Sequence, residues 1–235
     1  MSDQFPVEGF EGAIRAAMAS NAPAAERLRM IADYVRGMNP AFANGVDRFL
    51  TRLKQAQSGA GAPNVGEAMP SFLLPDQDGR LVALETLLQR GPLILAFLRG
   101  HWCPYCRVAT AALAQASVRA RDIGAHIAAI SPEFAPFAQN LRTGAGVDFP
   151  ILADLDNGYA LSLNLAVWVD DDMAKLMSGA GVDLPRYQGN ESWIIPIPAT
   201  FAVNQSGVIV ERHVDADYRE RADLDVMLSA LQRPA

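Results

Sequence analysis

LILAFLRGHWCPYC, residues 93–106, joins an apolar run to two closely spaced cysteines. Residues 93–98 include no polar side chain, which is typical of a central strand buried on both faces of a sheet. Pro104 directly follows the first cysteine, and proline favours the first position of a helix. The segment therefore predicts a strand, a short connection, and a helix whose first turn carries Cys103 and Cys106.

Strand and helix patterns alternate downstream of this segment and just before it. Short strands are predicted at residues 72–74, 81–84, 93–98, 125–130 and 149–152, and a hairpin at 200–210 around a Gly-containing turn. Helices are predicted from Pro104 to about Asp122, from Ser131 with Pro132 at its first position, and over Asp223–Leu231. This alternation predicts an α/β fold, an open sheet with helices on both faces.

The first part of the chain reads differently. Residues 12–37 and 41–56 follow the helical period, with a break at Asn39-Pro40. Residues 58–63 are small or turn-forming and predict a linker. We expect an N-terminal helical extension at 1–62 and a second domain at 63–235. The apolar faces of the extension must bury against that domain or against another subunit, as in a homodimer.

Charge and composition narrow the class of protein. The chain has 235 residues, 50% of them apolar, and a net charge of −6. Such a balance argues against a nucleic-acid surface. No apolar run approaches the roughly 20 residues of a membrane span, and the N-terminus lacks a signal-peptide pattern. We expect a cytoplasmic protein that binds neither nucleic acid nor membrane.

The two cysteines are the only ones in the chain. In a reducing cytosol, a Cys-x-x-Cys pair is more often catalytic or metal-binding than structural. At a helix N-terminus, free N–H groups and the helix dipole stabilise a thiolate. We expect Cys103 to be the more exposed nucleophile and Cys106 to close a disulfide with it; the reverse order stays open. Arg99, His101 and Arg107 would add positive charge.

A zinc site is the main alternative chemistry. His101, Cys103 and Cys106 offer three ligands, but closed zinc sites need four, often from two paired motifs, and no second pair is present. We therefore expect no metal and no other cofactor. Asp170–Asp172 is expected to be a solvated loop, because calcium requires better-spaced oxygens.

Three segments together resemble one family: residues 65–72, 99–106, and 197–201 with 206–209. They are similar to the alkyl hydroperoxide reductase/thiol-specific antioxidant family, the peroxiredoxin-like members of the thioredoxin fold, in its Cys-Pro-x-Cys branch. The resemblance implies a thioredoxin-like fold with a central mixed sheet. It also implies a cysteine that a peroxide oxidises to sulfenic acid and a second thiol resolves. A thiol donor such as thioredoxin or glutathione would complete the cycle.

Two positions depart from the family pattern. Family members place Thr or Ser three residues before the peroxidatic cysteine, where this chain has Gly100 or Cys103, depending on the alignment. They also carry an Arg on the late strand pair, where this chain has Pro198. In thioredoxins a proline at that place is cis and lies against the dithiol. Five residues are expected to support the dithiol: Arg99, His101, Trp102, Pro104 and Pro198.

The sequence therefore leaves three functions open. Peroxide reduction through a dithiol–disulfide cycle is the leading hypothesis. The second is a thioredoxin- or glutaredoxin-like reductase of disulfides, since Cys-Pro-Tyr-Cys is also a glutaredoxin tetrapeptide. The third is non-enzymatic: a redox sensor or a zinc-binding adaptor.

Overall fold

A five-stranded mixed sheet forms the centre of the computed structural model, which describes residues 9–233. From one edge to the other its strands are β5 (Ile151–Ala153), β4 (His126–Ser131), β3 (Leu93–Phe97), β8 (Ala199–Val203) and β9 (Ile209–Val214). β3 runs parallel to β4 and antiparallel to β8. All five residues of β3 are buried, which explains why that segment contains no polar side chain. The predicted mixed sheet is confirmed.

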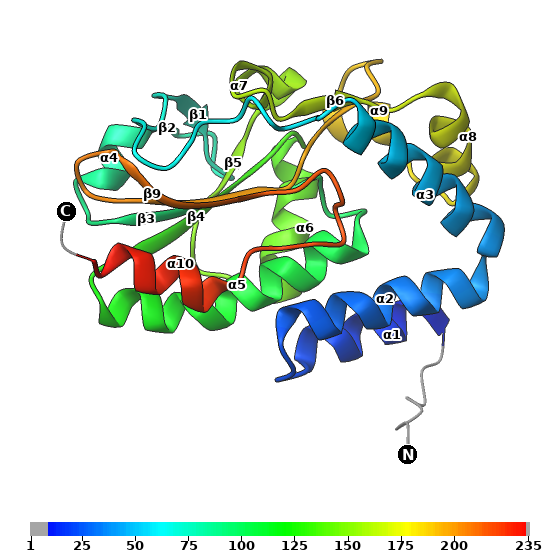
Figure 1. Cartoon of the computed structure of the whole chain (residues 1–235), viewed down its shortest axis with the longest axis horizontal. Helices are drawn as coiled ribbons and strands as arrows, with labels where there is room; N and C mark the ends of the chain where they lie inside the picture. The colour runs from blue at the N-terminus through cyan, green and yellow to red at the C-terminus, as the bar shows by residue number, and fades with distance from the viewer. Residues whose placement is uncertain (1–8, 234–235) are drawn as a thin grey trace.

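Helices cover both faces of this sheet (Figure 1). α5 (Pro104–Asp122), α6 (Ala135–Ala145) and α10 (Leu224–Leu231) lie on one face. α7 (Gly158–Ser162) lies on the other, where the Tyr159 ring packs against Phe97 and Phe72 at 5.9 and 5.1 Å between centroids. This arrangement places the N-terminus of α5 at the carboxyl end of β3, where open α/β sheets bind their ligands.

Three helices precede the sheet: α1 (Gly9–Ala19), α2 (Ala24–Met38) and α3 (Pro40–Gln55). The single helical stretch predicted at 12–37 is wrong, since residues 20–23 separate α1 from α2 and end in a proline that cannot continue the first helix. The stretch at 41–56 is confirmed as α3, which Asn39 caps by accepting a hydrogen bond from the Phe42 N–H at 3.0 Å. Residues 1–8 of the expected extension lie outside the described residues.

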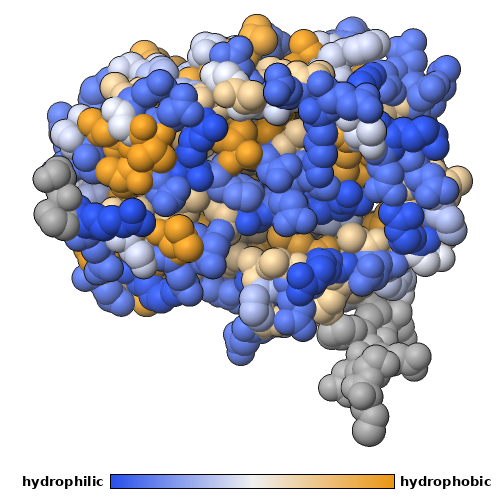
Figure 2. Space-filling view, in the orientation of Figure 1, coloured by the Kyte–Doolittle hydropathy of each residue, from blue (hydrophilic) through white to orange (hydrophobic). Residues whose placement is uncertain are grey.

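The apolar faces of these helices bury within the same chain. α1 and α2 pack against α5, and Ile14, Ala17, Leu28 and Ile31 are all buried. α3 buries Val46, Phe49, Leu50 and Leu53 and turns hydrophilic side chains to the surface (Figure 2). Of the two alternatives for these apolar faces, the structure shows burial against the rest of the same chain.

The remaining elements test the other sequence predictions. The predicted hairpin is confirmed as β8 with β9, and the predicted helix at the C-terminal end is confirmed as α10 with Asp223 as its cap. The two short strands predicted at 72–74 and 81–84 are present as β1 (Leu73–Pro75) and β2 (Leu81–Ala83), which pair antiparallel. The helix start at Ser131 is wrong: Ser131 ends β4, and α6 begins at Ala135. The loop at Asp170–Asp172 is also wrong, because Asp170 caps α8 by accepting from the Met173 N–H.

Seven further elements were not predicted from the sequence: α4 (Leu84–Leu88), η1 (Leu155–Asn157), α7, β6 (Ala166–Trp168), α8 (Asp171–Gly179), α9 (Leu184–Gln188) and β7 (Ile194–Pro196). Most are three to five residues long, too short for a periodic pattern to emerge. Within residues 9–233, no helix has the length and apolar character needed to cross a bilayer.

Candidate active site

The two cysteines lie in the first turn of α5. Cys103 is the N-cap residue and Pro104 the first helical residue, as the sequence predicts. Both thiols are free, and both residues are 0% exposed. The expectation that Cys103 is the more exposed of the two is therefore wrong. The side chains of Tyr105 and Tyr218, edge to face at 5.1 Å, are buried beside them.

Arg99 is a buried charged residue beside the dithiol. It is 6% exposed, and its guanidinium lies 3.7 Å from the centroid of the Tyr218 ring and 4.8 Å from that of Trp102. Its main-chain N–H donates to Cys106 Sγ at 3.2 Å. Among residues 9–233 no carboxylate forms an ion pair with it. A buried, unpaired cation is costly, so a nearby thiolate is a favourable counter-charge.

A second cation reaches the dithiol from a distant part of the sequence. Arg221, between β9 and α10, lies with Nη2 3.8 Å from Cys106 Sγ. Its Nη1 donates to the carbonyl oxygens of Tyr218 and Glu220, which fixes the guanidinium on its own segment. Arg221 could not be predicted as part of the site, since no local pattern distinguishes it from the other arginines near the C-terminus.

These surroundings shift the pKa values of the two thiols in opposite directions. Burial opposes ionisation of Cys103, but a hydrogen bond with Cys106 and the charges of Arg99 and Arg221 outweigh it and lower its pKa to about 5. Burial raises the pKa of Cys106 well above its ordinary value, and the neighbouring Cys103 raises it further. At neutral pH the site therefore holds a Cys103 thiolate beside a Cys106 thiol.

The connection between β3 and α5 is held by a buried carboxylate. Glu133 is 0% exposed and accepts a hydrogen bond from the His101 main-chain N–H at 2.7 Å, and its Oε1 lies 2.7 Å from His101 Nδ1. Burial raises the pKa of Glu133, and the contacts with His101 oppose that shift. The His101 ring packs against Phe137 and Tyr187. In the described part of the chain it makes no hydrogen bond or ion pair with either cysteine.

Gly100 has no room for a side chain. Its φ is +141°, and a Cβ would lie 2.6 Å from the Glu133 carboxyl group and from the Trp102 indole nitrogen. A Thr or Ser three residues before Cys103 is thus incompatible with this backbone.

One other expectation at this site, the cis form of Pro198, changes. The peptide bond before Pro198 is trans, as are all peptide bonds in residues 9–233, and Pro198 is buried between β7 and β8. The cis form expected by analogy is therefore wrong. The described residues also contain no group of three or more His, Cys, Asp and Glu side chains that could hold a metal ion, and so His101, Cys103 and Cys106 do not form a ligand set.

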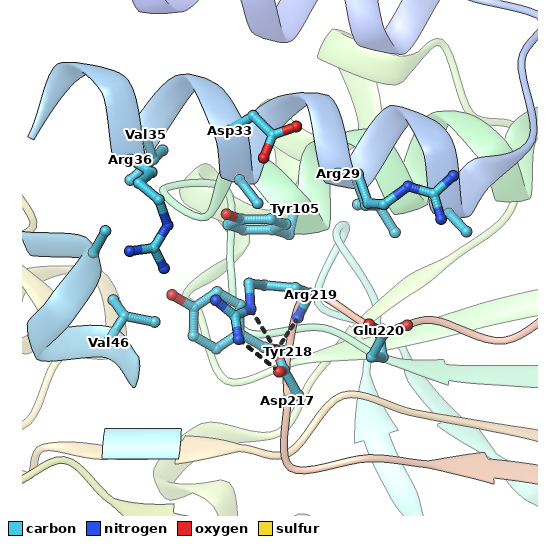
Figure 3. Close-up of a pocket in the computed structure, with 14 residues that line it drawn as sticks. Arg29, Asp33, Val35, Arg36, Val46, Tyr105, Asp217, Tyr218, Arg219 and Glu220 are labelled. Carbon is cyan, nitrogen blue, oxygen red and sulfur yellow. Dashed lines mark hydrogen bonds and ion pairs between the residues drawn. The ribbon is translucent and has the colours of Figure 1, made fainter. Parts of the chain in front are cut away.

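A cavity of about 270 Å³ adjoins the tyrosine pair. Figure 3 shows Tyr105 above Tyr218, with Arg36 and Val46 to one side and Arg219 bonded to Asp217. The cavity lies between α2, α3 and the segment 217–220. The helices α2 and α3 therefore lie beside the tyrosine pair that packs next to the dithiol.

Comparisons with known proteins agree with this geometry. The AhpC/TSA family model matches residues 65–212, which include the dithiol and all five strands of the sheet except the last two residues of β9. No curated protein matches the sequence.

Solved structures share the fold at low identity. Peroxidoxin BcpB of Mycobacterium tuberculosis has a TM-score of 0.56 and 18% identity, covering 72% of this chain and 96% of its own. A cysteine-to-serine mutant of peroxiredoxin 6 of Arenicola marina has a TM-score of 0.55 and 15% identity, covering 72% of each chain. A thiol peroxidase of Chromobacterium violaceum has a TM-score of 0.51 and 18% identity, covering 73% of this chain and 87% of its own.

These structures establish a thioredoxin-like fold of the peroxiredoxin kind. The family model matches well over half of the chain, and its range contains the strand, connection and helix that hold the two cysteines. This chain therefore belongs to the AhpC/TSA family.

Proposed function

We propose that this protein is a thiol-dependent peroxidase in which Cys103 attacks the peroxide and Cys106 resolves the oxidised product. The observation that carries the proposal is the asymmetry of the dithiol: Cys103 has a pKa of about 5, whereas burial and Cys103 keep the Cys106 thiol protonated. A thiolate is the nucleophile in such chemistry. Membership of the AhpC/TSA family supports peroxide as the substrate.

The cycle balances in three steps. The Cys103 thiolate attacks one peroxide oxygen, the O–O bond breaks, and the products are a Cys103 sulfenic acid and an alkoxide or hydroxide that takes up a proton. The Cys106 thiol then attacks the Cys103 sulfur, which forms the disulfide and releases water. Two thiol groups of a donor such as thioredoxin or glutathione reduce that disulfide by exchange and become oxidised themselves.

The buried state of both sulfurs adds a requirement. Because neither residue is exposed, the side chains above the first turn of α5 must move before a peroxide or a donor thiol reaches Cys103. A small neutral peroxide suits such a site, because it brings no charge into the interior and leaves the Arg99 guanidinium beside the Cys103 thiolate.

We assign the chemistry to residues 63–235 and a supporting role to the helices of residues 1–62. A cytoplasmic location fits the cycle, because thiol donors keep cysteines reduced there. The supporting residues at the dithiol are Arg99, which supplies charge, and Trp102, which packs on Arg99.

The test is peroxide consumption by the wild-type protein and by Cys103→Ser and Cys106→Ser, each supplied with dithiothreitol and then with thioredoxin. Cys103→Ser is expected to lose activity by at least about a thousandfold, as nucleophile removal does in other enzymes. Cys106→Ser is expected to form sulfenic acid once per site and then to turn over slowly. Wild-type turnover by both variants would overturn the assignment.

Disulfide reduction is the second candidate, favoured by one observation. Gly100 excludes the hydroxyl residue that peroxiredoxins place before the reactive cysteine. Assaying an exposed protein disulfide beside hydrogen peroxide separates the two functions. We expect peroxide to be the faster substrate, because stabilising the thiolate stabilises the reduced dithiol and makes the pair a weaker reductant.

A further inference from the structure

Residues 217–221 lie between the dithiol and the N-terminal helices. On the inner side, the Tyr218 ring lies against the Arg99 guanidinium at 3.7 Å, and Arg221 lies 3.8 Å from Cys106 Sγ. Arg221 thus brings a positive charge to the dithiol, and Tyr218 packs against Arg99, which supplies the other positive charge beside the thiolate.

On the outer side, ion pairs tie the same segment to α3, and a further ion pair ties α3 to α2. Arg219 donates to both carboxylate oxygens of Asp217, at 2.8 Å each, and its Nη1 donates to Asp47 Oδ1 on α3 at 2.9 Å. The other oxygen of Asp47 pairs with Arg36 of α2 at 2.6 Å. Lys54 of α3 lies 3.5 Å from Asp217.

This network is more than a single surface pair. Isolated exposed ion pairs contribute little, but connected ones with fixed geometry contribute more. Asp217 is 5% exposed, and the hydrogen bonds of Arg219 keep its pKa below the usual range despite the opposing effect of burial. Hydrogen bonds from Arg36 and Arg219 also lower the pKa of Asp47.

The family-matched residues end at 212, and they begin at 65. Both halves of this contact, α3 with Asp47 and the segment with Arg219, lie outside that range. The charge environment of the dithiol therefore depends on parts of the chain beyond the matched region.

We propose that Asp47 is a positioning residue for the Cys103 thiolate: through Arg219 it holds residues 217–221 so that Tyr218 and Arg221 stay against the dithiol. The role of Asp47 in peroxide reduction rests on the proposed function, whereas its effect on the thiolate does not. It thereby gives the N-terminal helices a part in tuning the nucleophile.

Within residues 9–233, charged and titratable groups approach Cys103 from three parts of the fold. Arg99 approaches from the β3–α5 connection, Arg221 and Tyr218 from the segment 217–221, and Tyr105 and Cys106 from α5 itself. Glu133 faces Cys106. Asp47 touches none of the sulfurs in the described contacts, and its influence must pass through Arg219.

The experiment titrates the thiolate in the reduced full-length protein, by absorbance near 240 nm and by the pH dependence of the iodoacetamide reaction. Asp47→Asn and Arg219→Gln are compared with Asp47→Glu, which keeps the charge. The control is Asp148→Asn, which removes a 2.6 Å ion pair with Arg121 at the other end of α5. Thermal unfolding is recorded for each variant.

We expect Asp47→Asn and Arg219→Gln to raise the apparent pKa of Cys103 by up to about one unit, with partial rescue by Asp47→Glu and no shift in the control. Peroxide kcat/KM should fall several-fold near pH 5.5 and converge with wild type near pH 8. Combining Asp47→Asn with Arg221→Gln should shift the pKa of Cys103 by less than the sum of the two single shifts, because part of the Asp47 effect passes through the Arg221 contact.

Three results would overturn the proposal: an unchanged titration in Asp47→Asn, an equal loss of activity at all pH values, or additive effects in the double variant. A wild-type protein that fails to consume peroxide, while the variants still shift the thiolate titration, would instead remove the proposed function and leave the positioning role standing.

Discussion

The two sides of the dithiol have different origins in the sequence. One side is contiguous: residues 99–106 carry Arg99, the connection and both cysteines. The other side is remote, because Arg221 arrives from a segment more than a hundred residues further along the chain. The contiguous side supplies the two sulfurs, whereas the remote side helps to set which sulfur is ionised.

Gly100→Ala tests the contiguous side most severely. The variant must place a Cβ 2.6 Å from the Glu133 carboxyl group at a φ of +141°, and strain of this kind together with overpacking costs about 2–4 kcal/mol. Urea unfolding of the reduced protein measures the loss. Gly79→Ala is the matched control, since Gly79 also has a positive φ of +78° but no neighbour within 4 Å. Equal losses in the two variants would show that the connection is not tightly packed around Gly100.

Arg99→Met tests the charge that the contiguous side supplies. Arg99 helps to lower the Cys103 pKa to about 5, and an opposite charge at close range shifts a pKa by about 1–3 units. The variant should therefore titrate about two units higher. Because the thiolate is the basic form, activity is lost from the acid side: near pH 6, kcat/KM should fall about tenfold, with recovery toward wild type above about pH 8. A pH-independent loss would mean that Arg99 acts by packing on Trp102 and Tyr218.

Arg221→Gln tests the remote side and should give the smallest change. Arg221 ranks behind Arg99 among the charges that lower the Cys103 pKa, so we expect a rise of about one unit and a two- to threefold loss of kcat/KM near pH 6. The same alkylation and peroxide assays apply. If this shift exceeded that of Arg99→Met, the remote side would be the dominant source of charge.

Much of the fold was predictable because its patterns are local. The apolar run at 93–98 and the Pro104 helix start could be read from neighbouring residues, and both are present as β3 and α5. The helix start at Ser131 failed for the opposite reason. Ser-Pro-Glu has the composition of a helix N-terminus, but Glu133 is withdrawn into the interior to bind the His101 main chain.

The sequence by itself determined that this protein has a dithiol at a strand-to-helix junction, because buried strands and helix starts leave marks on adjacent residues. Only the tertiary structure decided that both sulfurs are buried, that Gly100 excludes a side chain, that Arg221 lies near Cys106, and that Asp47 pairs with Arg219. These features depend on side chains meeting across the fold. Burial and electrostatic interactions depend on distances in space, and the separation of two residues along the chain does not reveal those distances.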